Sequence, residues 1–329
     1  MNTSSKQVAL DSRALLILYL IVPICVLIAL IDVLIFDSQL KLGHLPSQPD
    51  EWFLWALLFN LPHIISSFVT LADKEYLQHY RSNFLPALLI IILIAGIVIA
   101  GIQYESTEKT SYYTKIFVFL MYALFTTNHV LAQQFGIAVI LMKSPPTSEF
   151  KAVKLISIVG AVYIYLALFI PSSNQIILLT YPLLFLSGCI LYFGILAVRS
   201  SKTTIGKYYL LLNMAMLLAI FFLAALDYVV FVLLIPRFVH DISAFLIYSN
   251  HDLNRNSTVK KNFIYRTLYF IPLPYLILVP LIGVVLAGVL ERFLVIFFGV
   301  LFVLDFYHYY IETKIWKKEG LHRFNLYIR

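Results

Sequence analysis

Long apolar runs separated by short polar segments recur along the whole chain. Each run has about 20 residues, the length that an α-helix needs to cross the ~30 Å hydrocarbon core of a bilayer. The runs show no strand-like alternation that would favour a membrane barrel. The pattern therefore predicts an all-α polytopic membrane helix bundle. Its ten expected transmembrane helices lie near residues 13–36, 51–72, 84–104, 112–142, 152–170, 175–198, 207–226, 228–249, 267–290 and 293–313.

Composition agrees with this assignment. The chain has 329 residues, of which 61% are hydrophobic and only 12% are charged, whereas about a quarter of the residues in a typical soluble domain are charged. No polar connection is long enough for a separate soluble domain. We therefore expect residues 1–329 to form a single transmembrane helical domain.

The basic residues are distributed unevenly between the two predicted sides of the membrane. Of the 24 Lys and Arg residues, nineteen fall on the N-terminus, alternate loops and C-terminus, and four fall on the opposite side. The positive-inside rule then places both termini in the cytoplasm. We expect a multi-pass protein of the cytoplasmic (inner) membrane. The net charge of +7 is explained by this topology rather than by nucleic-acid binding, because the basic residues do not cluster on a soluble domain.

One apolar segment carries an unusual number of ionisable residues. Within residues 231–255 these are Arg237, His240, Asp241, His251 and Asp252. Ionisable groups inside a membrane helix are costly and normally face other protein or a water-filled cavity. The two His-Asp doublets share one helix face but are separated by a rise of ~16 Å, so they do not bind one metal ion together. Arg237 and Asp241 have the i, i+4 spacing of an intrahelical ion pair.

Histidines or acids lie at a similar predicted depth in four helices that run in the same direction. At 1.5 Å per residue, His63, His129, His240 and Asp305 lie roughly 13 to 21 Å from the cytoplasmic helix ends. Asp305 and His308 have the acid-x-x-His spacing by which helical bundles present two ligands to one metal. The predicted metal ligands are His63, His129, His240 and His308.

Other polar residues are expected to assist these ligands. Asp305 is a candidate ligand or catalytic base, and Asp241 is a candidate acceptor that orients a ligating imidazole ring. A second, shallower tier of candidate residues comprises His79, His251, Asp252 and Glu312, together with Arg237. For His44 and His322, in a loop and in the tail, we expect structural roles.

Imidazole and carboxylate ligands suit iron, zinc or manganese. No thiolate ligands are expected, because Cys25 and Cys189 lie inside predicted spans as packing residues, and this argues against an iron-sulfur cluster. The ligand types alone leave iron, zinc and manganese open, and haem remains an alternative.

The dispersal of single histidines and acids over several spans resembles polytopic bacterial membrane oxygenases of the carotene-cleaving type. The resemblance covers the general layout of most of the chain and assigns no individual residue. It implies a non-haem iron that activates O2 against a lipid-soluble substrate. We therefore expect an integral membrane metalloenzyme, a non-haem iron oxidoreductase or oxygenase, whose partners are the lipid bilayer and a hydrophobic small-molecule substrate.

Two other functions are open for the same residues. A proton-coupled secondary transporter would use them as a relay, and helix breaks at Pro62 and Pro236 would favour it, although no internal repeat is visible. A haem-binding membrane protein would use two histidines as axial ligands.

Two further expectations concern the helices themselves. The first span is almost uniformly apolar, so its role is expected to be packing with much of its surface toward lipid. The three prolines of the ninth span, Pro272, Pro274 and Pro280, predict a kinked helix.

Overall fold

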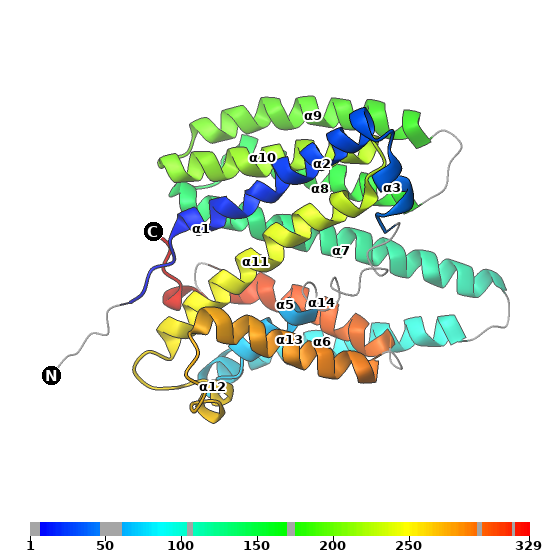
Figure 1. Cartoon of the computed structure of the whole chain (residues 1–329). Coiled ribbons are helices and arrows are strands. Elements are labelled where there is room, and N and C mark those ends of the chain that lie inside the picture. The colour runs from blue at the N-terminus through cyan, green and yellow to red at the C-terminus, as the bar shows by residue number, and fades with distance from the viewer. Residues whose placement is uncertain (1–6, 47–60, 104–107, 170–174, 295–297, 318–319) are drawn as a thin grey trace. The chain divides into compact units, whose positions relative to one another are not determined.

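A computed structural model describes residues 7–46, 61–103, 108–169, 175–294, 298–317 and 320–329 (Figure 1). Within these ranges the chain is helical and forms no strands, apart from the isolated bridges Leu10–Ile328 and Asp73–Asn262. The all-α prediction is therefore confirmed. The bounds of the first helices are α1 Ser12–Ile17, η1 Leu18–Leu20, α2 Ile21–Ile35, α3 Gln39–Gly43, α5 Leu61–Thr70, α6 Lys74–Gln103 and α7 Glu108–Met142. The later ones are α8 Ser148–Phe169, α9 Gln175–Arg199, α10 Thr204–Ala225, α11 Val229–Arg255, α12 Phe263–Thr267, α13 Tyr275–Leu294, α14 Phe298–Ile315 and η3 Leu321–Asn325.

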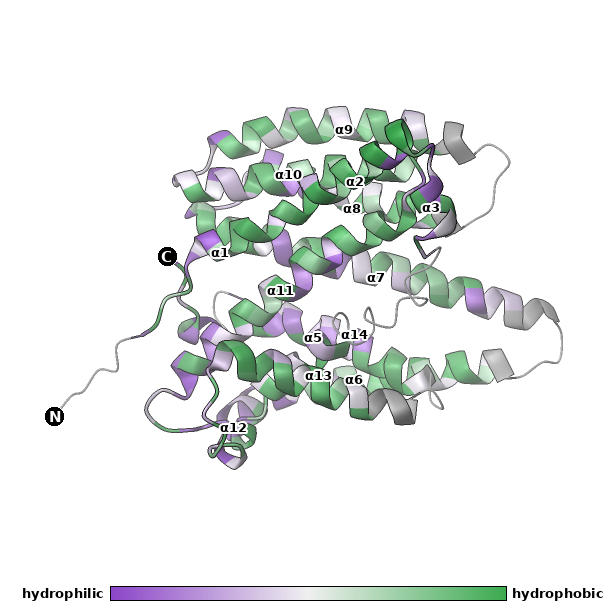
Figure 2. Cartoon of the chain, viewed as in Figure 1, coloured by the Kyte–Doolittle hydropathy of each residue, from purple (hydrophilic) through white to green (hydrophobic). Residues whose placement is uncertain are grey.

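Seven of the described helices are long and apolar enough to cross a membrane. They cover Ser12–Ile35, Lys74–Gly101, Tyr112–Met142, Ser148–Ala167, Leu179–Arg199, Thr204–Ala225 and Val229–Arg255. Figure 2 shows hydrophobic residues along most of their length. These helices indicate a membrane protein. The count of ten spans and the cytoplasmic position of both termini stay predictions, as does the part of the second span at residues 51–60, which lies outside the described residues.

The chain divides into two compact units, which are described separately. Unit 1 comprises Met1–Leu10, Ala56–Met121 and Ser243–Arg329, and unit 2 comprises Asp11–Trp55 and Tyr122–Ile242. The expectation of a single domain stays a prediction.

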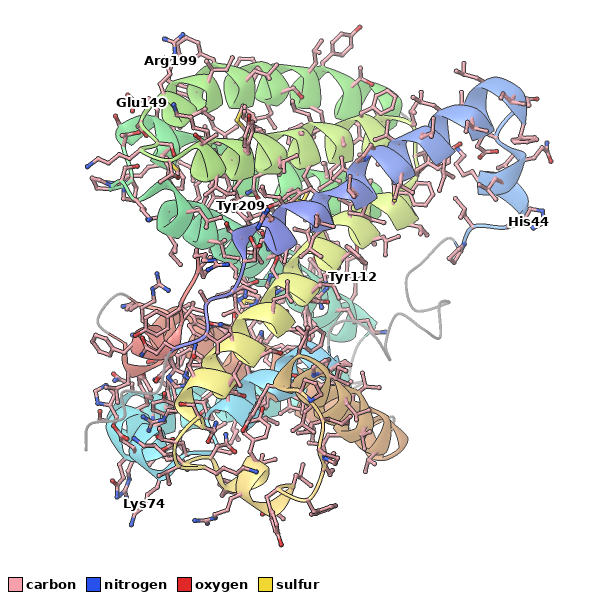
Figure 3. All side chains as sticks on the ribbon, turned by 60° about the vertical axis from the view of Figure 1, so that its left-hand side comes forward. His44, Lys74, Tyr112, Glu149, Arg199 and Tyr209 are labelled. Atoms are coloured by element: carbon pink, nitrogen blue, oxygen red, sulfur yellow. The ribbon has the colours of Figure 1, made fainter. Side chains whose placement is uncertain are left out.

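In unit 2, α9 packs against both α8 and α10, and α10 also contacts α2. The N-terminus of α10 lies directly against the end of α7, because a Cβ atom at Gly206 would be 2.5 Å from the Cα atom of Met142. The hydroxyl of Thr203 caps α10 by accepting from the Gly206 N–H. Figure 3 shows Glu149 and Arg199 at one end of this unit and His44 at the other.

A buried amide in α7 connects the N-terminal helix of unit 2 to α10. The hydroxyls of Tyr209 and Tyr19 both donate to the Oε1 atom of Gln134, at 2.5 Å and 3.2 Å. The two tyrosine rings meet edge-on with centroids 5.5 Å apart, and Figure 3 marks Tyr209 at this position. The buried Oε1 atom of Gln134 is thus paired with two hydroxyls, as burial of a polar atom in an apolar interior favours.

The first span has a polar role that its sequence pattern did not reveal. Asp32 is completely buried and accepts hydrogen bonds from the Leu40 N–H, the Lys41 N–H and the Tyr228 hydroxyl at 2.7 to 2.9 Å. The carboxylate therefore anchors the turn that contains α3. Ile17 and Leu34 on the same span are exposed, as expected for residues that face lipid.

In unit 1, α5 packs against α13 and α14, and α14 packs against α6 (Figure 1). Gly283 of α13 permits a close approach to the backbone of α5, because a Cβ atom there would be 2.5 Å from the carbonyl oxygen of Pro62 and 2.7 Å from the Oγ atom of Ser66. Asn250 of α11 holds both ends of the described chain, since it donates to the Val8 carbonyl and accepts from the Tyr327 N–H.

The expectation of one kinked helix over residues 267–290 is wrong. Pro272 and Pro274 lie in a non-helical connection, and only Pro280 lies inside α13. Proline lacks an N–H group and disfavours helical backbone at the residue before it, so this pair separates α12 from α13 instead of bending one helix. By contrast, α11 continues as a helix through Pro236 to Arg255, which removes one of the helix breaks that favoured a transporter.

Candidate metal centre

Two histidines and one glutamate converge in unit 1. His63 comes from α5, while His308 and Glu312 lie one turn apart on α14. One potential ligand atom from each residue lies within 4.8 Å of those of the other two. The two imidazole rings meet edge-on with centroids 4.6 Å apart, and all three residues are at least 94% buried. This group can hold a metal ion.

Ser67 determines which nitrogen of His308 can bind a metal. Its Oγ atom lies 2.8 Å from Nδ1 of His308, and its hydroxyl donates to the Ile64 carbonyl oxygen at 2.6 Å. Because the serine proton is already used, Oγ accepts the Nδ1 proton of His308. The lone pair of the neutral imidazole is then on Nε2, the form in which a histidine ligates.

Tyr248 of α11 contacts both Glu312 and His63. Its hydroxyl donates to the Oε1 atom of Glu312, and its ring stacks on His63 with centroids 5.9 Å apart. The bond fixes the orientation of the carboxylate. Sequence reasoning missed Tyr248 and Ser67 because it searched for ionisable residues. The spacing of Tyr248 three residues before His251, on the polar face of α11, was the available signal.

The other two predicted ligands form a pair in unit 2. The rings of His129 on α7 and His240 on α11 meet edge-on with centroids 4.9 Å apart. The Oδ1 atom of Asp241 lies 3.7 Å from Nε2 of His240. The expected ion pair is also present, with Nε of Arg237 3.7 Å from Oδ2 of Asp241. The four histidines thus form one pair in each unit, and a single ion shared by all four stays a prediction.

Asp305 is buried on α14, one turn before His308. Its predicted role as ligand or base stays a prediction.

The second tier of candidates separates into different environments. Glu312 lies beside His63 and His308, although it is one turn further along α14 than His308. A helical side chain points back toward the N-terminus of its helix, so the Glu312 side chain spans part of the rise between the two residues. His251 uses both ring nitrogens in hydrogen bonds, Nδ1 with Asp252 at 2.8 Å and Nε2 with the Tyr76 hydroxyl at 3.0 Å. This geometry leaves no nitrogen of His251 for a metal. His79 is exposed on α6.

Asp252 is the centre of a hydrogen-bond network. Its Oδ2 atom accepts from the Tyr265 hydroxyl at 2.5 Å and from the Thr70 hydroxyl at 3.2 Å. Burial and the neighbouring carboxylate raise the pKa of Tyr265 well above its ordinary value, so the phenol stays protonated and donates. These bonds hold Asp252 in the position from which its Oδ1 atom contacts Nδ1 of His251.

His322 lies beside His251 and is fully buried. Its ring stacks on Tyr76 with centroids 3.9 Å apart and on His251 at 4.8 Å. Burial lowers the pKa of His322 well below its ordinary value, and the neighbouring His251 and Arg255 lower it further. A neutral, stacked ring agrees with the structural role expected for this residue. His44, by contrast, is exposed just after α3.

No family model, no curated protein and no solved structure matches this chain. The likeness to carotene-cleaving oxygenases consequently stays a prediction from layout.

Proposed function

We propose that the protein is a membrane metalloenzyme whose metal ion is held by His63, His308 and Glu312. The observation that carries this proposal is the convergence of the two imidazoles and the carboxylate inside unit 1, with ligand atoms within 4.8 Å of one another. Two histidines and one carboxylate form the ligand set of non-haem iron(II) oxygenases, which leaves coordination positions open for O2 and substrate.

Zinc hydrolases use a similar ligand set, so the surroundings must distinguish the two chemistries. Hydrolysis needs a supply of water, whereas His63, His308 and Glu312 are buried together with Tyr248 in an apolar helical unit. Such a site excludes water and suits the oxidation of an apolar substrate. We therefore favour iron and a lipid-soluble substrate that enters from the bilayer. When bound, the iron would supply the activation of O2.

The residues around the ligands have definable tasks in this proposal. Ser67 fixes the His308 ring with Nε2 toward the metal, and such supporting bonds raise the basicity of the ligand. Tyr248 holds one oxygen of Glu312. Asp305 is the carboxyl group that we assign as base, and Asp241 in unit 2 orients His240.

Metal analysis of the detergent-purified protein tests the proposal. We expect about one iron per chain and no Soret absorption band. His63→Ala, His308→Ala and Glu312→Gln should each lose the metal. The exposed histidines provide matched controls, and His44→Ala and His79→Ala should retain it. Unchanged iron in all three ligand variants would refute the assignment.

The same measurement separates the alternatives. A Soret band would indicate haem, and a protein without metal would favour the transporter. Parallel analysis of His129→Ala and His240→Ala tests whether the pair in unit 2 contributes to metal binding. Loss of metal in both variants would support the four-histidine prediction.

A further inference from the structure

A line of aromatic side chains runs through unit 1 from the candidate metal centre. Tyr248, which bonds to Glu312, stacks near Trp316 with ring centroids 5.7 Å apart. Trp316 follows α14 directly, four residues after Glu312, and its ring lies 5.8 Å from His322. His322 in turn stacks on Tyr76 at 3.9 Å. The three residues in this line that can be oxidised by one electron, Tyr248, Trp316 and Tyr76, are thus joined by adjacent rings.

Tyr76, the last residue of the line, has His251 as a proton acceptor of defined orientation. Asp252 lies 2.8 Å from Nδ1 of His251, so the neutral imidazole carries its proton on Nδ1. Nε2 therefore accepts from the Tyr76 hydroxyl at 3.0 Å. The Tyr76 oxygen also accepts from the side-chain amide of Asn325 at 2.9 Å. The phenolic proton of Tyr76 consequently has one direction of transfer, toward His251.

The charges around Tyr76 favour loss of that proton together with an electron. The Arg255 guanidinium lies over the Tyr76 ring, 4.3 Å from its centroid, and a cation in this position disfavours a positive charge on the ring. Arg255 is itself paired with Asp73 and Glu75. A proton on His251 would be stabilised by Asp252, whose carboxylate is held by Tyr265 and Thr70.

We propose that Tyr76 is a redox-active tyrosine that exchanges one electron with the metal centre through Trp316 and Tyr248 and exchanges its proton with His251. In the oxidising direction the Tyr76 ring loses one electron and its O–H bond breaks. The proton forms an N–H bond at Nε2 of His251, which leaves a neutral tyrosyl radical beside an imidazolium. A soluble one-electron donor of the thiol or ascorbate class restores the phenol, and the proton returns from His251.

The electron acceptor in this scheme is the oxidised metal ion of the proposed centre, so the link to the metal rests on the proposed function. The Tyr76–His251–Asp252 arrangement does not rest on it. The role that we propose for Tyr76, which is to return the metal centre to a usable oxidation state when no substrate is bound, does rest on it. The two parts are tested separately.

The first test uses the full chain in detergent after removal of metal by a chelator. Photogenerated ruthenium(III) tris-bipyridine serves as the one-electron oxidant, and electron paramagnetic resonance detects the radical after rapid freezing. The radical should collect on Tyr76, because its proton stays bonded nearby on a base. Tyr76→Phe should remove most of the signal. Tyr209→Phe is the matched control, since Tyr209 is an equally buried tyrosine that donates to a neutral amide, and it should leave the signal unchanged.

His251→Gln tests the base itself, because glutamine keeps a hydrogen-bond acceptor but is not basic. Removal of a positioned base should slow radical formation by about 10²-fold. Equal signals in the wild type, Tyr76→Phe and His251→Gln would overturn the inference, whatever the metal content.

The second test uses iron-loaded protein treated with hydrogen peroxide. The tyrosyl signal should form in the wild type and fall strongly in Trp316→Leu, while iron content stays unchanged. A Tyr76 signal in the photochemical test with none in this one would overturn the link to the metal centre.

Discussion

Gly283→Ala tests how closely the helices of unit 1 must pack to form the metal centre. The added Cβ atom would lie 2.5 Å from the Pro62 carbonyl oxygen, so α5 or α13 must retreat by about 0.9 Å to reach an ordinary contact of 3.4 Å. The obstructing atom is backbone, and it belongs to the residue directly before His63. The displacement of the Pro62 backbone therefore also moves His63, which we assign as a metal ligand.

The size of this shift predicts a larger effect on metal binding than on folding. Overpacking of this kind costs about 1–3 kcal/mol of stability. Ligating groups, however, must be held within about 0.5 Å of their productive positions, and a shift of about 0.9 Å exceeds that limit. We expect Gly283→Ala to fold with a lowered melting temperature and to lose most of its iron.

Iron analysis and thermal unfolding of the purified variants measure the two effects. Gly96→Ala is the matched control, because Gly96 lies inside α6 of the same unit and a Cβ atom added there would meet no neighbouring group within 4 Å. That variant should keep its iron and should be at least as stable as the wild type, since alanine favours helix by up to about 1 kcal/mol over glycine. Equal iron content and melting temperature in Gly283→Ala and the wild type would refute the reasoning.

Three other predictions address separate features. Asp32→Asn weakens the hydrogen bonds to the turn around α3. Because a buried acceptor loses its charge, the free energy of unfolding measured with a chemical denaturant should fall by about 1–3 kcal/mol. Stability equal to that of the wild type would contradict the anchoring role. Ser67→Ala removes the partner of His308 Nδ1 and should weaken iron binding about 10–100-fold in a chelator competition, whereas unchanged affinity would show that Ser67 does not orient the ring. Burial lowers the pKa of His322, so the unfolded chain binds a proton at His322 more readily than the folded chain does. The free energy of unfolding should therefore be constant above a pH of about 6.5 and fall below it. His322→Gln should reduce that fall, and an unchanged pH profile in this variant would show that His322 does not contribute to it.

The candidate ligands were partly predictable from sequence because membrane burial makes ionisable residues conspicuous. His63 and His308 stood out as single histidines in apolar runs, and each is buried in the structure. Glu312 was placed in a shallower tier, since a depth estimate from Cα positions ignores the reach of a long side chain back along its helix. His251 was placed in the same shallower tier, and only the structure shows that both of its ring nitrogens are used in hydrogen bonds.

The sequence by itself determined the helical class, the membrane assignment and the approximate positions of most of the described helices, because these depend on local composition and on the length of apolar runs. Tertiary structure alone decided the partners: which imidazole faces which, that Ser67 and Tyr248 support the centre, and that Asp32 anchors a turn rather than facing lipid. Such pairings join residues far apart in the chain, and their geometry depends on close approaches such as that at Gly283, which no periodicity in the sequence records.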